Sequence, residues 1–208
     1  MERVSHICLG IVGMLVLSAC ASTPSPHAAR PPVQSQSAQS HSGLQLPDKV
    51  QFMQTDKRWA SQTLGGSGES LKSDGCLVTS AAMALVNLGF QTDPGDLAYR
   101  LKAYGGFNKQ GWLVWSGLEK ATSGKAKTVF YERKDNAAVR SCLAAGFYPL
   151  VRFNLPTSKT HWAMVVGDSH QGFYVRDPMV NSRTPIPLSS RTKTIDAVRC
   201  IGVKASKV

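Results

Sequence analysis

The fold is decided by a stretch in the middle of the chain, which reads Ser73-Asp74-Gly75-Cys76-Leu77-Val78-Thr79-Ser80-Ala81-Ala82-Met83. Polar residues and a glycine lead into a cysteine, and an apolar run follows it. This pattern predicts a loop and then a buried helix that begins at Cys76. The N-terminal end of a helix carries partial positive charge, which favours a thiolate over a thiol. Cys76 is therefore a candidate nucleophile, and it needs a base from elsewhere in the chain.

Outward from Cys76, the hydrophobic pattern changes from helical spacing to alternation. We expect the first helix to end near residue 88, a second helix to be capped by Thr92, a third short helix to contain Trp112, Trp115, Leu118 and Ala121, and a fourth to be capped by Asp135. Strands are expected at residues 127–132, 148–154, 161–167, 172–177 and 197–204. Helices early in the chain and antiparallel strands later predict an α+β fold, with the helix of Cys76 packed on the sheet.

Two residues of the expected hairpin are suited to activate the cysteine. His161 and Asp177 are equally far in sequence from Ser169. A turn centred there would place them opposite one another on the same face of the sheet. A carboxylate beside an imidazole fixes its tautomer and stabilises its charged form. The upstream amide of Gln54, with the backbone N–H of Cys76, would then stabilise the oxyanion.

The N-terminal segment has the pattern of an export signal. Residues 1–19 contain an apolar run that is shorter than a typical membrane-spanning helix, and they end in Leu17-Ser18-Ala19 before Cys20. This ending resembles a bacterial lipobox, in which the cysteine is lipidated; the competing interpretation is a plain secretory signal. We expect residues 20–46 to be a lipidated cysteine and a disordered tether, and residues 47–208 to be the folded domain. The expected location is extracytoplasmic, on the cell membrane or the outer membrane.

The chain has five cysteines. Cys8 lies within the expected signal and Cys20 follows it, which leaves an odd number in the domain. An odd count in an exported protein suggests one pair and one free, reactive thiol. The simplest partition pairs Cys142 with Cys200 and leaves Cys76 free. The alternative is that Cys142 and Cys200 are ordinary buried thiols.

The charge of the chain is strongly basic, with a formal net charge of +11 over 208 residues. Such a balance suits anionic surfaces, including anionic envelope polymers. The lysines and arginines are scattered and do not alternate with aromatic residues, so we expect no nucleic-acid partner. The sequence has no phosphate-binding glycine loop and no CxxC pair, and we expect neither a cofactor nor a metal.

Four blocks of the sequence resemble one enzyme family when they are taken together. They are Gln54-Thr55-Asp56-Lys57-Arg58-Trp59, the stretch from Gly75 to Met83, His161-Trp162, and Val175-Arg176-Asp177-Pro178. Their order and intervals are similar to those of the C-thirty-nine-like cysteine peptidases, relatives of the bacteriocin-leader-processing peptidases. The resemblance covers roughly residues 48–204. It implies a papain-like fold, Cys76 as nucleophile, His161 as base, Asp177 as orienting acid and Gln54 as oxyanion residue.

The sequence therefore predicts a membrane-anchored cysteine hydrolase that cleaves peptide or amide bonds in a peptide or protein substrate. Two alternatives stay open. The same residues would serve an acyl transferase or transpeptidase, since the sequence does not separate water from an amine as the acceptor. A third possibility is a non-catalytic module that binds the cell envelope through its basic surface.

Overall fold

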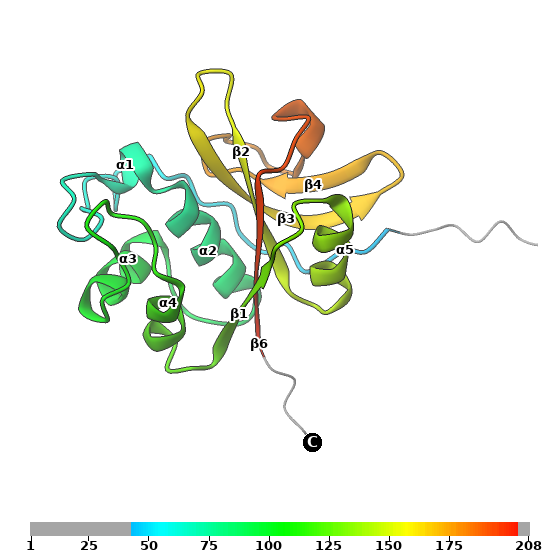
Figure 1. Cartoon of the computed structure of the whole chain (residues 1–208). Helices are drawn as coiled ribbons and strands as arrows, with labels where there is room; N and C mark the ends of the chain where they lie inside the picture. The colour runs from blue at the N-terminus through cyan, green and yellow to red at the C-terminus, as the bar shows by residue number, and fades with distance from the viewer. Residues whose placement is uncertain (1–42, 204–208) are drawn as a thin grey trace, which may run out of the picture. The chain divides into compact units, whose positions relative to one another are not determined.

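A six-stranded antiparallel sheet forms the centre of the fold, with the strand order β1-β6-β2-β3-β4-β5 (Figure 1). The computed structural model describes residues 43–203, so the predicted signal, the lipidated Cys20 and most of the predicted tether lie outside the described residues. The strands are β1 (Ala126–Tyr131), β2 (Tyr148–Asn154), β3 (Thr160–Ser169), β4 (Gly172–Arg176), β5 (Ile186–Pro187) and β6 (Ala197–Val203). The helices are α1 (Leu71–Asp74), α2 (Cys76–Asn87), α3 (Pro94–Ala103), α4 (Trp115–Ala121), α5 (Asn136–Ala144) and the 3-10 turn η1 (Leu188–Ser190).

The two faces of the sheet are covered by different helices (Figure 1). Side chains alternate between the faces along each strand. On β2, Leu150 packs into the core that contains α2, whereas Val151 packs into the core that contains α5. The predicted α+β fold, with the helix of Cys76 buried against an antiparallel sheet, is confirmed. Among the described residues, no helix is both long enough and apolar enough to span a membrane.

A single glycine joins the two helices that lead to the cysteine. Gly75 is the C-cap of α1 and the N-cap of α2. A Cβ atom at this position would collide with the backbone of Leu71. Only glycine therefore allows α1 to turn so tightly into α2, and this turn fixes the position of Cys76 as the first residue of α2.

Two predicted helix starts were wrong by a few residues. Asp93, not Thr92, caps α3, because its carboxylate accepts the backbone N–H of Asp96 at 2.8 Å. Helix α4 begins at Trp115, because the preceding residues form a loop in which the side chain of Asn108 accepts the N–H of Trp112 at 2.9 Å.

The register of the β3–β4 hairpin differs from the symmetry about Ser169 that the sequence suggested. Ser169 pairs with Gly172, so the turn is centred between His170 and Gln171 and not at Ser169. A bulge between Val165 and Gly167 then shifts the register by one residue, and Met164 pairs with Arg176. Continuing this register places Asp177 level with Ala163, two residues from His161 and on the same face. Without the bulge the two side chains would face opposite sides of the sheet.

A disulfide joins Cys142 of α5 to Cys200 of β6. The two Cα atoms are 6.0 Å apart, and both residues are buried. The bond ties α5, the only α-helix on its side of the sheet among the described residues, to an interior strand. The partition suggested by the sequence is the one found, and Cys76 is the free cysteine of residues 43–203.

We predict that replacing both Cys142 and Cys200 with alanine lowers the free energy of unfolding by about 4 kcal/mol, because the bond closes a loop with a sequence separation of 58. Urea unfolding measured in a Cys76→Ser background, where thiol exchange is blocked, gives the value. The fully reduced parent is the control. Equal midpoints for oxidised and reduced protein would contradict the prediction.

Candidate active site

His161 and Asp177 form a buried pair at the start of β3 and just after β4. The Nε2 atom of His161 lies 2.8 Å from Oδ1 of Asp177, and both residues are 1% exposed. Phe153, directly opposite on β2, packs its ring edge-to-face against the imidazole at 5.3 Å between centroids. The His161–Asp177 pair is therefore shielded from water. The imidazole is held by Phe153 on β2 and by Asp177 just after β4, the two strands that neighbour β3.

Three donors surround the carboxylate of Asp177. Besides the imidazole, the backbone N–H of Met179 donates to Oδ1 at 2.8 Å, and Nε of Arg191 donates to Oδ2 at 2.8 Å. Burial would by itself raise the pKa of Asp177. The hydrogen bond and charge of His161, the Met179 amide and the charge of Arg191 outweigh burial and lower that pKa below its usual value. Asp177 is thus held as an anion.

The charge of Asp177 determines the tautomer of His161. An ionised carboxylate can only accept hydrogen bonds, so Nε2 of His161 must carry the proton that lies between them. In the neutral imidazole, Nδ1 then has a free lone pair. His161 is therefore set up to accept a proton at Nδ1.

Cys76 contacts β3 at Trp162, the residue that follows His161. Its sulfur accepts from the backbone N–H of Trp162 and from that of Leu77, and both contacts favour the thiolate. Ser80, one turn further along α2, donates to the carbonyl of Trp162 at 3.3 Å. Both backbone groups of Trp162 thus contact α2, and they fix the start of this helix beside the His161 end of β3.

The thiol of Cys76 is the neutral form in the resting site. Burial is the largest influence and raises its pKa to about 11, and the charges of Asp74 and Asp177 act in the same direction. The expectation that the helix terminus alone would favour the thiolate was therefore wrong, because desolvation exceeds the effect of the two N–H groups. No hydrogen bond between the Cys76 sulfur and the His161 ring occurs among residues 43–203, so their direct contact stays a prediction.

Gln54 lies between the two halves of the site. Its backbone N–H donates to the carbonyl of Pro178 at 3.0 Å, and its Nε2 donates to the carbonyl of Lys72 at 2.9 Å. The side chain is buried, and its Oε1 has no partner within residues 43–203. Since Nε2 carries two N–H groups and Lys72 occupies one, the other remains for a ligand.

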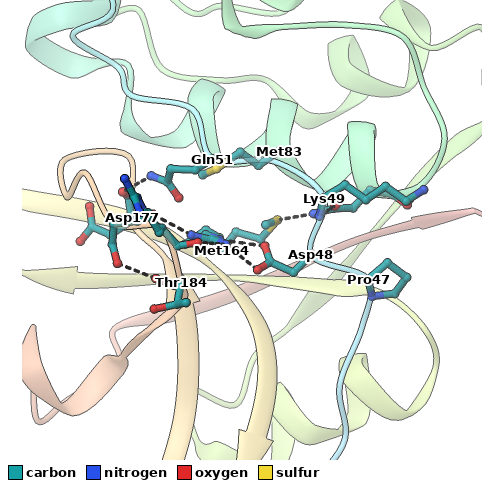
Figure 2. A network of polar contacts seen from close by, with 12 residues as sticks. Pro47, Asp48, Lys49, Gln51, Met83, Met164, Asp177 and Thr184 are labelled. Atoms are coloured by element: carbon teal, nitrogen blue, oxygen red, sulfur yellow. Dashed lines mark hydrogen bonds and ion pairs between the residues drawn. The ribbon is translucent and has the colours of Figure 1, made fainter.

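The N-terminal segment of the domain holds the loop after Asp177 in place (Figure 2). Gln51 donates through Nε2 to the carbonyl of Asp177 at 2.8 Å and to that of Val180 at 3.3 Å. Asp48 forms a bidentate ion pair with Arg176, the last residue of β4, at 2.6 and 2.8 Å. The segment therefore connects the end of β4 to the first helices.

Sequence reasoning missed Arg191 and Gln51. Arg191 follows η1 and lies 14 residues from Asp177 in sequence, and no local pattern marks it. Gln51 falls in a stretch without periodicity. The bond from the Met179 N–H did have a signal, because an Asp side chain that accepts from the residue two positions later is ordinary turn chemistry.

Comparison with known proteins finds a likeness among solved structures, at low sequence identity. No family model matches the chain, and no curated protein matches it. A solved structure from Bacillus anthracis, described as a "putative C39-like peptidase", aligns with a TM-score of 0.49 and 15% sequence identity, over 76% of this chain and 96% of that one. Among residues 43–203, no group of three or more His, Cys, Asp and Glu residues could hold a metal ion.

We predict that alkylation of the half-buried Cys76 by iodoacetamide is slow at neutral pH and rises towards pH 11, because desolvation keeps the proton on the thiol. The rate is followed by intact mass from pH 6 to pH 11, with Cys76→Ala as the blank. A midpoint below pH 8 would show that a thiolate is already present in the resting site.

The same shift affects stability, and its sign follows from the raised pKa of Cys76. The folded state holds the thiol proton more tightly than the unfolded chain does, so this contribution is present below about pH 8.5 and is lost as the pH rises towards 11. Urea unfolding compared between the parent and Cys76→Ala should show that the parent loses more stability over this range. Parallel curves would contradict the prediction.

Proposed function

We propose that this protein is a cysteine hydrolase that cleaves peptide or amide bonds, with Cys76 as nucleophile, His161 as base, Asp177 as orienting acid and Gln54 as oxyanion donor. The buried hydrogen bond between His161 and Asp177 is the main support. A protonated Nε2 leaves Nδ1 as the proton acceptor, and the one free cysteine among residues 43–203 begins the helix that contacts the next residue, Trp162.

The reaction starts from the neutral thiol. Nδ1 of His161 takes the S–H proton as the sulfur attacks the substrate carbonyl carbon, and the carbonyl oxygen becomes an oxyanion. The second N–H of the Gln54 amide and the backbone N–H of Cys76 stabilise that charge. The imidazolium, paired with Asp177, gives its proton to the leaving amine. Water then attacks the thioester with His161 again as base, and the thiol is regenerated.

We place this activity outside the cytoplasm, with the protein anchored to a membrane through lipid on Cys20. The lipobox-like ending of residues 1–19 motivates this placement. The disulfide between Cys142 and Cys200 supports it, because such bonds persist in oxidising compartments and are rare in the cytosol. Metabolic labelling with a palmitate analogue tests it: incorporation should be lost in Cys20→Ala, and retention of the label in that variant would contradict the anchor.

We predict a graded loss of activity when three of the four site residues are replaced singly. Cys76→Ala should abolish turnover. Gln54→Ala should lower kcat by about 10²- to 10³-fold, because one oxyanion donor is lost. Asp177→Asn should lower kcat further, by up to about 10⁴-fold, since an amide does not fix the reactive tautomer. Cleavage of quenched fluorescent peptides from a mixed library provides the assay.

The same experiment separates the alternatives. Asn87 is the matched control for Gln54, because it is a buried amide on α2 that contacts Lys49 and Met164, not the site. Asn87→Ala should retain kcat in whatever protein remains folded. Products joined to an added amine would indicate acyl transfer. Full activity in Cys76→Ala would overturn the proposed hydrolase. The absence of activity from the folded parent and from every folded variant would overturn it as well.

A further inference from the structure

Two arginines next to the candidate site lack a carboxylate partner. Residues 43–203 contain nine arginines, and six of them form ion pairs with acidic side chains. Arg152, Arg183 and Arg199 do not. Arg152 and Arg199 lie on the neighbouring strands β2 and β6, where Arg199 pairs with Leu150. Both are half-buried. Burial and the nearby charge of Arg152 lower the pKa of Arg199, so the two cations repel each other in a partly dehydrated place.

Asp196, whose backbone contacts that of Arg152, does not neutralise the two arginines with its carboxylate. The N–H of Asp196 donates to the carbonyl of Arg152 at 2.7 Å. Its carboxylate instead accepts from the side chain of Asn154 at 3.0 Å. The only acceptor for Arg199 among residues 43–203 is the carbonyl of Val198, at 2.8 Å. Arg152 and Arg199 therefore retain N–H groups that can donate to an anionic ligand.

The arginines lie on the face of the sheet that carries α2. Leu150 and Met164 pack into the core that contains α2, so the alternating Arg152 and Trp162 project from the same face. Arg152 is directly opposite Trp162 in the β2–β3 register. Because the backbone N–H of Trp162 contacts the sulfur of Cys76, Arg152 is one strand away from the nucleophile's own contact.

A row of aromatic rings borders the pair. Trp162 packs edge-to-face on Trp115 at 6.4 Å between centroids, and Trp115 does the same with Phe130 at 5.8 Å. The guanidinium of Arg199 lies over the ring of Phe130 at 5.0 Å. Phe130 is 53% exposed. The row therefore connects the residue beside the thiol with an open apolar surface, and the two cations lie along it.

We propose that Arg152 and Arg199 bind a carboxylate of the substrate near the bond that Cys76 attacks, so that the protein acts on acidic peptides. The inference rests on the proposed hydrolase and names its substrate class. Planar guanidinium groups match a carboxylate with two parallel hydrogen bonds, and the aromatic row accommodates the neighbouring substrate side chains.

The test uses two sets of short randomised peptides, acetylated and amidated at their ends. One set contains Asp and Glu, and the matched set has Asn and Gln in their place. We expect acidic residues to be enriched at one fixed position beside the cleaved bond, with cleavage about tenfold faster than for the amide peptides. Arg152→Gln should remove this preference, so that the acidic and the amide peptides are cleaved at equal rates. Arg152→Glu should shift the preference to Lys and Arg.

The control is Arg100→Gln, which removes the same charge from an exposed ion pair on α3 and should keep the acidic preference. A third peptide set with free C-terminal carboxylates tells a side-chain carboxylate from a chain-end carboxylate. Cleavage by the parent without an acidic preference, or a preference that survives in Arg152→Gln, overturns the inference and leaves the hydrolase standing.

A binding measurement separates this failure from failure of the hydrolase. Fluorescence anisotropy of both labelled peptide sets is measured with Cys76→Ala and with Cys76→Ala combined with Arg152→Gln. Tighter binding of the acidic set that is lost in the double variant supports the carboxylate site even if the parent cleaves no peptide. Equal binding of both sets by Cys76→Ala contradicts the site.

Discussion

The buried carboxylate of Asp177 is the constraint on which the site depends. An isolated anion in the protein interior costs several kcal/mol, so it persists only where donors surround it. Here His161 from β3, the Met179 amide from the following turn and Arg191 from beyond η1 provide them. Meeting this need draws three separate parts of the chain together. It also fixes the proton of His161 on the nitrogen that faces Asp177.

The second constraint is the way in which α2 meets the sheet. The helix begins at Cys76 because Gly75 allows a turn that a side chain would block. It is then held at its first two turns by both backbone groups of Trp162. Burial of the thiol is a consequence of this close approach. The thiol is therefore kept protonated, which limits its adventitious oxidation.

The α+β layout was predictable from the hydrophobic period. The odd cysteine count suggested one pair and a free thiol, but it left open whether Cys142 and Cys200 were that pair or ordinary buried thiols. The sequence predicted that His161 and Asp177 lie on the same face, but the prediction used a symmetry about Ser169 that the hairpin does not have. The bulge between Val165 and Gly167 puts the two side chains on the same face, and a bulge leaves no periodic signal in the sequence. Arg191 and Gln51 reach the site over long sequence distances, so no local pattern reports them. The raised pKa of Cys76 reflects desolvation by the folded chain, which a helix-terminus argument does not include.

The central claim is that Asp177 sets His161 to accept the proton of Cys76 at Nδ1. Nitrogen NMR of the histidine-labelled protein at neutral pH tests it most directly, with the His161 signals assigned by comparison with His161→Gln. The account predicts a protonated Nε2 and a bare Nδ1, whose signal moves when Cys76 is alkylated and loses its tautomeric bias in Asp177→Asn. A proton found on Nδ1, or a His161 signal indifferent to alkylation of Cys76, would contradict it.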